Sequence, residues 1–167
     1  MAWSPEPLKA SFAPIAGPAT RLLILGSLPG EASLRRAQYY GHPQNQFWRL
    51  LGRVLGAELP PDYEARLAAL QAAGVGLWDV VRTARRAGSL DAAIRDHQPN
   101  PLGDFTATLS QLRAIAFNGA TASAIGRKQL GAGVAAELIT LPSSSPAHTL
   151  AFDRKAEAWL RLRDFLG

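Results

Sequence analysis

The sequence predicts an α/β protein, a three-layer α/β/α sandwich in which a four-stranded parallel sheet lies between two layers of helices. Four short apolar runs alternate with longer segments whose apolar residues recur at helical spacing. Such alternation is typical of right-handed βαβ crossovers, which place helices on both faces of a parallel sheet. A polar or glycine-containing turn follows each apolar run. In a parallel sheet these turns meet at one edge, where open α/β sheets bind ligands.

Each expected strand is a largely apolar run, as in strands that are covered on both faces. The runs cover residues 21–26, 75–81, 113–117 and 137–141. Small or polar residues stand at or just after the end of each run. The first of them in the four runs are Gly26, Asp79, Asn118 and Ser143. We expect these residues to lie together at the carboxyl edge of the sheet.

The expected helices are segments in which apolar residues recur every three or four positions. In the clearest case, five apolar residues from Phe47 to Leu55 define one face of a segment that begins at Asn45. The helices cover residues 33–38, 45–55, 63–73, 90–95, 105–111, 120–130 and 152–165. Trp3 and Phe12 are candidate anchors for an irregular N-terminal arm. The stretches expected to be irregular are this arm at 1–20, a basic loop at 82–89 and a proline loop at 99–101.

The bulk composition fits a single domain over residues 1–167 and excludes several classes of site. Hydrophobic residues make up 47% of the chain, which is enough for a sizeable core. Cysteine is absent, which excludes disulfides, thiolate zinc sites and iron–sulfur clusters. The three histidines, His42, His97 and His148, are scattered without metal-ligand spacing. We therefore expect neither a metal nor a cofactor.

The charge of the chain makes nucleic acid a candidate partner. The net charge is +5, and three of the 18 basic residues are lysines while the rest are arginines. Arginine binds phosphate in a bidentate manner and stacks on bases. The composition bias of a GC-rich genome explains the same charge equally well. No stretch resembles a membrane span or a signal peptide, so we expect a cytoplasmic protein, and we expect it to be a monomer.

The turn from Gly26 to Gly30 follows the first strand and reads Gly-Ser-Leu-Pro-Gly. Two glycines at this place fit either a phosphate-binding loop or a tight turn. The turn lacks the Lys-Ser/Thr pair of a P-loop and the third glycine of a dinucleotide fingerprint. A tight turn is therefore the simpler interpretation.

The segment from Tyr39 to Trp48 combines aromatic residues with a histidine and a carboxamide. Phe47 and Trp48 are expected in the core, because the first turn of their helix must pack on the sheet. Asn45 stands where that helix begins, so it is a candidate N-cap as well as a candidate site residue. Tyr39 and Tyr40 are adjacent and cannot both face inward in a regular element, so at least one of them should line a cleft.

The segment after the last strand and a cluster of arginines are candidates for phosphate contacts. Hydroxyls and backbone amides suited to phosphate oxygens come from Ser143, Ser144 and Ser145. His148 follows them and is a candidate donor to a developing anion. The alternative is a serine-rich turn with a surface histidine, and the absence of Gly-x-Ser-x-Gly argues against a serine hydrolase. The densest basic patch, expected at the pocket rim or on a solvated face, consists of Arg82, Arg85 and Arg86.

Four sequence blocks resemble the uracil-DNA glycosylase superfamily and, within it, the sixth family, the hypoxanthine-DNA glycosylases. They read LILGSLPGEASLRRAQYYGHPQNQFW at 23–48, GVGLWDVVRTARRAGSLDAAI at 74–94, IAFNG at 115–119 and LPSSSPAHT at 141–149. The first and last blocks are the most specific. The resemblance implies a four-stranded parallel sheet between helices, and excision of a damaged base from DNA without a metal or cofactor.

The resemblance also implies roles for individual residues. Leu28 stands where the classical families carry the Asp or Asn that handles the catalytic water. The sixth family places its catalytic carboxamide in a His-Pro-x-Asn segment, which matches Asn45, and His148 would stabilise the departing base. Tyr40 or Tyr39 would stack on that base after it flips out of the duplex. The expected base-binding residues are Gly26, Ser27, Leu28, Tyr39, Tyr40, Asp79 and Asn118.

Three alternatives remain open at this level. Uracil and xanthine are alternatives to hypoxanthine as the substrate base, because pocket width is not visible in a sequence. A hydrolase of free nucleosides would use a similar pocket, although its basic surface would then have no role. A non-catalytic module that binds damaged DNA is favoured by Leu28, whereas the joint presence of Asn45, Asn118 and His148 argues against it.

Overall fold

The computed structural model describes residues 6–167 and contains a main sheet of four parallel strands in the order β3-β2-β6-β7. At its centre, β2 (Leu22–Gly26) pairs with β3 (Val75–Asp79) on one side and with β6 (Ala114–Asn118) on the other. β7 (Glu137–Leu141) completes the sheet beside β6. Every residue of β2, β3 and β6 is buried. The predicted four-stranded parallel sheet is therefore confirmed.

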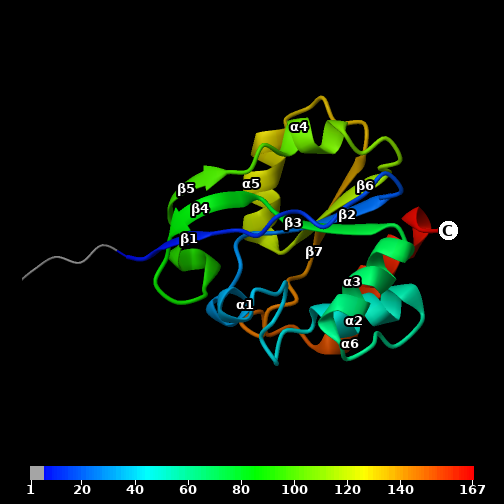
Figure 1. Ribbon diagram of the computed structural model, residues 1–167, viewed down its shortest axis with the longest axis horizontal. Helices are drawn as coiled ribbons and strands as arrows, with labels where there is room; N and C mark the ends of the chain where they lie inside the picture. Colours follow the sequence, from blue (N-terminus) through cyan, green and yellow to red (C-terminus); the bar gives the residue numbers. More distant parts are fainter. Residues whose placement is uncertain (1–5) are drawn as a thin grey trace, which may run out of the picture.

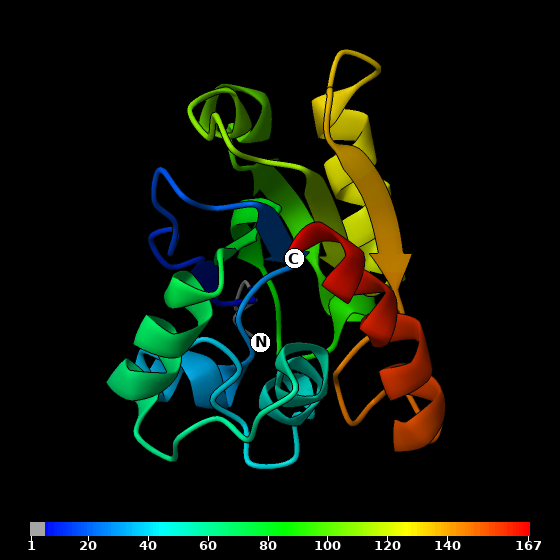
Figure 2. The ribbon, with the colours of Figure 1, turned by 90° about the vertical axis from the view of Figure 1, so that its right-hand side faces the viewer.

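Helices cover both faces of this sheet, which confirms the three-layer sandwich (Figure 1 and Figure 2). In β2, Leu22 and Ile24 belong to one core cluster, which includes residues of α2, α3 and α6. Leu23 and Leu25 belong to a second cluster, which includes residues of α4 and α5. The helices are α1 (Glu31–Arg36), α2 (Phe47–Leu55), α3 (Tyr63–Ala72), α4 (Leu102–Ala107), α5 (Ala120–Leu130) and α6 (Phe152–Trp159).

A second sheet was not predicted. It is antiparallel and has the order β1-β4-β5, with strands Leu8–Ala10, Val81–Arg85 and Arg95–Pro99. The prediction of a basic loop over 82–89 is therefore wrong for β4. The strand expected over 75–81 is two strands, because its residues after Asp79 leave the main sheet and enter the second one. In β4 only Val81 and Ala84 are buried, and an arginine follows each of them, so the sequence lacks both the apolar run and the strict alternation that indicate a strand.

Several boundaries also differ from the expectations. The N-terminal arm contains β1, and Ile15 forms a bridge with Leu77 of β3. The anchor role expected for Phe12 is confirmed by its edge contact with the Tyr39 ring, whereas Trp3 lies outside the described residues. The helix expected over 105–111 is α4, which begins after Pro101 instead. Short 3-10 helices cover Asp91–Ala93, in place of a helix over 90–95, and Leu160–Phe165, where the last α-helix was expected to continue.

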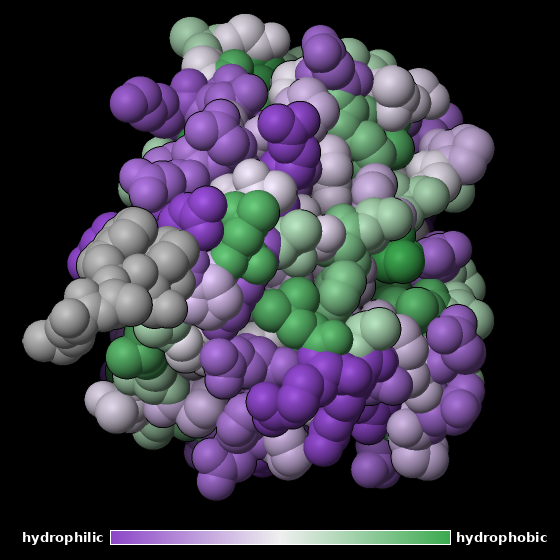
Figure 3. Space-filling model, turned by 60° about the vertical axis from the view of Figure 1, so that its left-hand side comes forward, coloured by the Kyte–Doolittle hydropathy of each residue, from purple (hydrophilic) through white to green (hydrophobic). Residues whose placement is uncertain are grey.

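The outer surface of the domain is mixed in character. Figure 3 shows hydrophilic surface interrupted by small apolar patches on the face that it presents. Within residues 6–167, no helix combines the length and the apolar character that crossing a membrane requires.

Candidate active site

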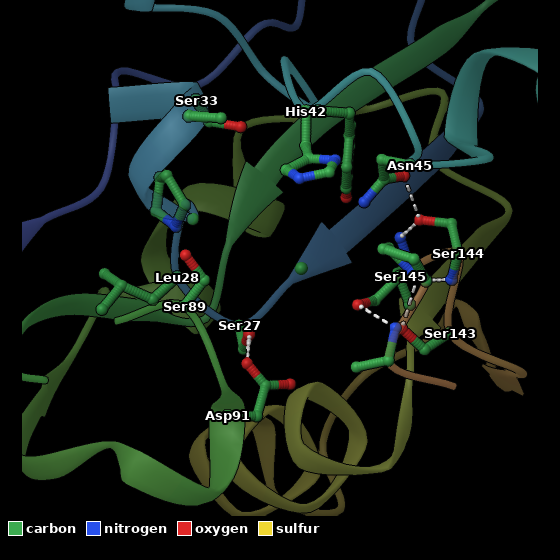
Figure 4. Close-up of a pocket in the computed structure, with 18 of the residues that line it drawn as sticks. Ser27, Leu28, Ser33, His42, Asn45, Ser89, Asp91, Ser143, Ser144 and Ser145 are labelled. Atoms are coloured by element: carbon green, nitrogen blue, oxygen red, sulfur yellow. Dashed lines mark hydrogen bonds between the residues drawn. The ribbon is translucent and has the colours of Figure 1, made fainter. Parts of the chain in front are cut away.

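A pocket of about 450 Å³ opens at the carboxyl ends of the parallel strands. Its walls come from the turn after β2, the segment between α1 and α2, the ends of β3 and β6, and the segment after β7 (Figure 4). A cavity of this volume suits a small organic ligand. The predicted site residues that line it are Gly26, Ser27, Leu28, Tyr39, Tyr40, Asn45, Asp79, Asn118, Ser143, Ser144, Ser145 and His148.

A chain of hydrogen bonds connects two carboxamides of the pocket through one serine. The Asn118 side chain accepts a bond from the Ser144 backbone N–H and donates one to the Ser144 hydroxyl, both at 2.9 Å. The Ser144 hydroxyl donates in turn to Oδ1 of Asn45 at 2.8 Å. The same oxygen accepts the backbone N–H of Phe47 at 3.0 Å. These hydrogen bonds thus hold Asn45 just before α2 and link it, through Ser144, to Asn118 at the end of β6.

The floor of the pocket contains an unpaired carboxyl group. Asp79 is 4% exposed, and its Oδ2 has no hydrogen-bond partner among residues 6–167. Burial, and secondarily repulsion from Asp91, raise the pKa of Asp79 to about 7, although the nearby Arg86 guanidinium opposes the shift. A carboxyl group with this pKa is largely protonated below neutral pH, so it can donate a hydrogen bond as well as accept one.

Gly26 is needed where it stands because two pocket side chains approach the end of β2. A Cβ atom at this position would lie 2.6 Å from Oδ1 of Asp79 and 3.1 Å from the Tyr40 hydroxyl oxygen. Both distances are shorter than ordinary van der Waals contact. The absence of a side chain at Gly26 therefore makes room for the polar floor of the pocket.

The two tyrosines have different surroundings. Tyr39 is 4% exposed, packs in the core, and donates its hydroxyl to the Ala13 carbonyl at 2.7 Å. Tyr40 lies flat on Phe47, with ring centroids 3.9 Å apart, and its buried hydroxyl has no hydrogen-bond partner among the residues that the structure describes. The Tyr40 backbone is left-handed, at a φ of 54°. Tyr40 is therefore the tyrosine whose polar end remains unsatisfied at the pocket floor.

Some polar residues of the pocket were missed in the sequence. Asp91 lines the pocket and accepts a 2.6 Å hydrogen bond from the Ser27 hydroxyl. Ser89 also contributes to the lining, and so does His42, the histidine of the predicted cluster from Tyr39 to Trp48. Asp91 and Ser89 lie in the block that resembles the glycosylases, just after Gly88, so their polar character after a glycine was the available signal.

The arginine cluster does not line the pocket. Arg86 is fully buried and donates to the backbone carbonyls of Leu28, Pro29 and Gly88. It therefore braces the turn after β2 and has no exposed guanidinium for a phosphate, which corrects the expectation for this residue. Arg82 is exposed and Arg85 partly exposed, and both belong to β4 outside the pocket lining.

The serine segment also divides into two kinds of residue. Ser144 is 1% exposed, so its hydroxyl is not accessible to a phosphate, which corrects the expectation for this serine. Ser143 and Ser145 are partly exposed, and His148 is exposed at the rim. Within the described part of the chain, no group of three or more His, Asp and Glu side chains is arranged to hold a metal ion.

The fold and the site together define an α/β/α protein whose pocket for a small organic ligand lies at the carboxyl edge of its sheet. The family model of the uracil DNA glycosylase superfamily matches residues 14–164. The chain belongs to this superfamily and is a DNA glycosylase, a hydrolase of N-glycosyl bonds that acts on DNA.

Individual relatives agree with this assignment. A hypoxanthine DNA glycosylase of Methanosarcina acetivorans is 38% identical over 153 residues, which cover 91% of this chain and 96% of the relative. One of Methanosarcina barkeri is 44% identical over 112 residues, or 66% of this chain and 71% of the relative. A solution NMR structure of a protein described as a candidate uracil DNA glycosylase of M. acetivorans has a TM-score of 0.84 and 37% identity. The structural match covers 95% of this chain and 98% of the chain in the NMR structure.

Proposed function

We propose that this protein is a monofunctional DNA glycosylase that releases hypoxanthine from deoxyinosine in DNA. The observation that carries the proposal is the Asn45 carboxamide, held by Ser144 and Phe47 at the wall of the pocket. Two relatives named hypoxanthine DNA glycosylase support the choice of base. Leu28 has no group that handles water, and Asn45 is the carboxamide that takes this role in our proposal.

The proposed reaction begins when the target nucleotide leaves the base stack and its base enters the pocket. The polar edge of the base meets Asp79 and the Tyr40 hydroxyl at the floor. The C1′–N9 bond breaks toward an oxocarbenium-like sugar, and its electron pair stays with the base. A water held beside Asn45 bonds to C1′ and loses a proton to solvent, while the base takes up a proton. His148 at the rim stabilises the departing base as charge develops.

Contacts to the DNA backbone are proposed for the partly exposed serines Ser143 and Ser145, whose segment forms part of the rim. Lys155 supports this segment, because its ammonium group donates to the Ser145 carbonyl at 3.2 Å. We further propose that the protein acts as a monomer in the cytoplasm. Phosphate contacts release counterions, so binding should weaken steeply with salt.

The test is base release by one purified batch of protein from duplexes that carry hypoxanthine, uracil or xanthine, followed by alkaline cleavage. We expect the fastest release from the hypoxanthine duplex, and loss of release in Asn45→Ala with DNA binding nearly unchanged. The name of the NMR neighbour makes uracil the second candidate base. Faster release of uracil would favour that candidate, and full activity of Asn45→Ala would refute the role of Asn45. Release from free deoxyinosine but from no duplex would point to a nucleoside hydrolase.

A further inference from the structure

The orientation of the Asn45 carboxamide is set by a residue that is almost fully buried. Ser144 is 1% exposed and lies between Asn118 and Asn45. We propose that Ser144 is a positioning residue, which fixes Asn45 with its amino group directed into the pocket and its oxygen directed away. The inference rests on the proposed function only for the role of Asn45 in the reaction.

The backbone of Ser144 is held on both sides. Its N–H donates to Oδ1 of Asn118 at 2.9 Å, and its carbonyl accepts the N–H of Gln46 at 3.0 Å. The first bond ties the serine to the end of β6, and the second ties it to the residue before α2. Strand β6 and the residue before α2 therefore fix the backbone of Ser144, which places the Ser144 hydroxyl next to Asn45.

The direction of every hydrogen bond in this chain follows from two backbone donors. The N–H of Ser144 requires an acceptor, so the Asn118 atom that it meets is the oxygen, and the Asn118 amino group then donates to the Ser144 hydroxyl. The N–H of Phe47 likewise requires the oxygen of Asn45. The Ser144 hydroxyl accepts from Asn118 and so has its own proton free to donate to Asn45.

The consequence concerns the atom that Asn45 offers to a substrate. A carboxamide oxygen has two lone pairs, and Oδ1 of Asn45 already accepts from Ser144 and Phe47. The amino group is the part of the side chain that remains. In Figure 4 it points away from Ser144, into the pocket. Asn45 therefore acts as a hydrogen-bond donor, which holds a water through a lone pair and does not accept its proton.

The test compares Ser144→Ala with a matched control, Ser123→Ala. Ser123 is also buried and hydrogen bonded, to Thr140 and Arg127, but it does not line the pocket. The single-turnover rate of base release is measured as a function of enzyme concentration. The substrate is the duplex whose base the wild type releases fastest. Ser144→Ala should lower the maximal rate about 10- to 100-fold with little change in half-saturation, whereas Ser123→Ala should keep the maximal rate. A Ser144→Ala variant that keeps the maximal rate, or that changes only half-saturation, overturns the proposal.

A double-mutant cycle tests whether Asn118 acts through Ser144. If Asn118 only orients the serine, Asn118→Ala combined with Ser144→Ala should lose no more rate than the stronger single variant. Additive losses would mean that Asn118 contacts the base directly. They would remove Asn118 from the positioning chain.

A measurement without substrate separates this inference from the proposed function. Nitrogen-15 relaxation of the Asn45 side-chain amide in the free protein should report greater motion in Ser144→Ala than in wild type or Ser123→Ala. Unchanged motion would overturn the positioning role even if base release is observed. Increased motion in a protein that releases no base would uphold the contact and refute the proposed function alone.

Discussion

Asp79 and Asp91 line the same pocket in opposite states of hydrogen bonding. Oδ1 of Asp91 accepts the Ser27 hydroxyl at 2.6 Å, whereas Oδ2 of Asp79 has no partner among residues 6–167. Burial raises the pKa of both carboxyl groups, but the hydrogen bond from Ser27 opposes this shift at Asp91, whereas no such donor opposes it at Asp79, whose pKa rises to about 7. The hydrogen bond from Ser27 is therefore the contact that distinguishes the two carboxyl groups, because burial raises the pKa of both.

The raised pKa of Asp79 predicts that stability falls as pH rises. Asp79 ionises at about 7 in the folded protein and at its ordinary value of 3.8 in the unfolded chain. The folded protein therefore binds more protons between these values, and its free energy of unfolding decreases through this window. In Asp79→Asn this decrease is absent. Between pH 5 and pH 8, urea unfolding should show the variant gaining about 3 kcal/mol relative to wild type. A difference that stays constant with pH would contradict the assignment.

The two adjacent tyrosines predict opposite effects of the same substitution. Tyr40→Phe removes a buried hydroxyl that has no hydrogen-bond partner within residues 6–167, so the free energy of unfolding should rise by about 1 kcal/mol. Tyr39→Phe removes a hydroxyl that donates to Ala13 at 2.7 Å, so it should fall by about 1 kcal/mol. Base release should slow in Tyr40→Phe if its hydroxyl meets the base. Thermal unfolding and single-turnover cleavage measure both effects, and shifts of the same sign would exclude this account.

Gly26 predicts a site that is intolerant of even one methyl group. In Gly26→Ala, the new Cβ would clash with Oδ1 of Asp79 at 2.6 Å and with the Tyr40 hydroxyl at 3.1 Å. We expect both side chains to be displaced and base release to be lost. The matched control is Gly103→Ala in α4, where a Cβ meets nothing within 4 Å and alanine should stabilise the helix by up to about 1 kcal/mol. Wild-type release by Gly26→Ala would show that the floor of the pocket is not used.

Uniform burial made the central strands of the main sheet predictable from the sequence. β2 and β6 are buried along their whole length, so an uninterrupted apolar run identifies each of them. The second sheet was missed because only Val81 and Ala84 are buried in β4, and the arginines that follow them are typical of a basic loop.

The pocket could also be predicted only in part from the sequence. Its polar residues follow the strands, so their convergence could be predicted from the parallel topology. The partners of those residues could not be predicted. Ser144 donates a hydrogen bond to Asn45, which lies 99 residues away along the chain, and no local pattern indicates this contact. Charged residues are rarely buried, so a pattern of arginines alone assigns Arg86 to the surface.

The burial of Arg86 predicts that the arginines of its cluster differ in what they stabilise. Arg86→Ala leaves the buried carbonyls of Leu28 and Pro29 without their donor, so the free energy of unfolding should fall by about 2 to 4 kcal/mol. Arg82→Ala removes an exposed side chain and should change it by less than about 0.5 kcal/mol. Because the Leu28 turn lines the pocket, Arg86→Ala should also slow base release at temperatures where the variant remains folded. Chemical denaturation gives the free energy of unfolding of both variants. Equal values would mean that the guanidinium of Arg86 does not stabilise the turn after β2.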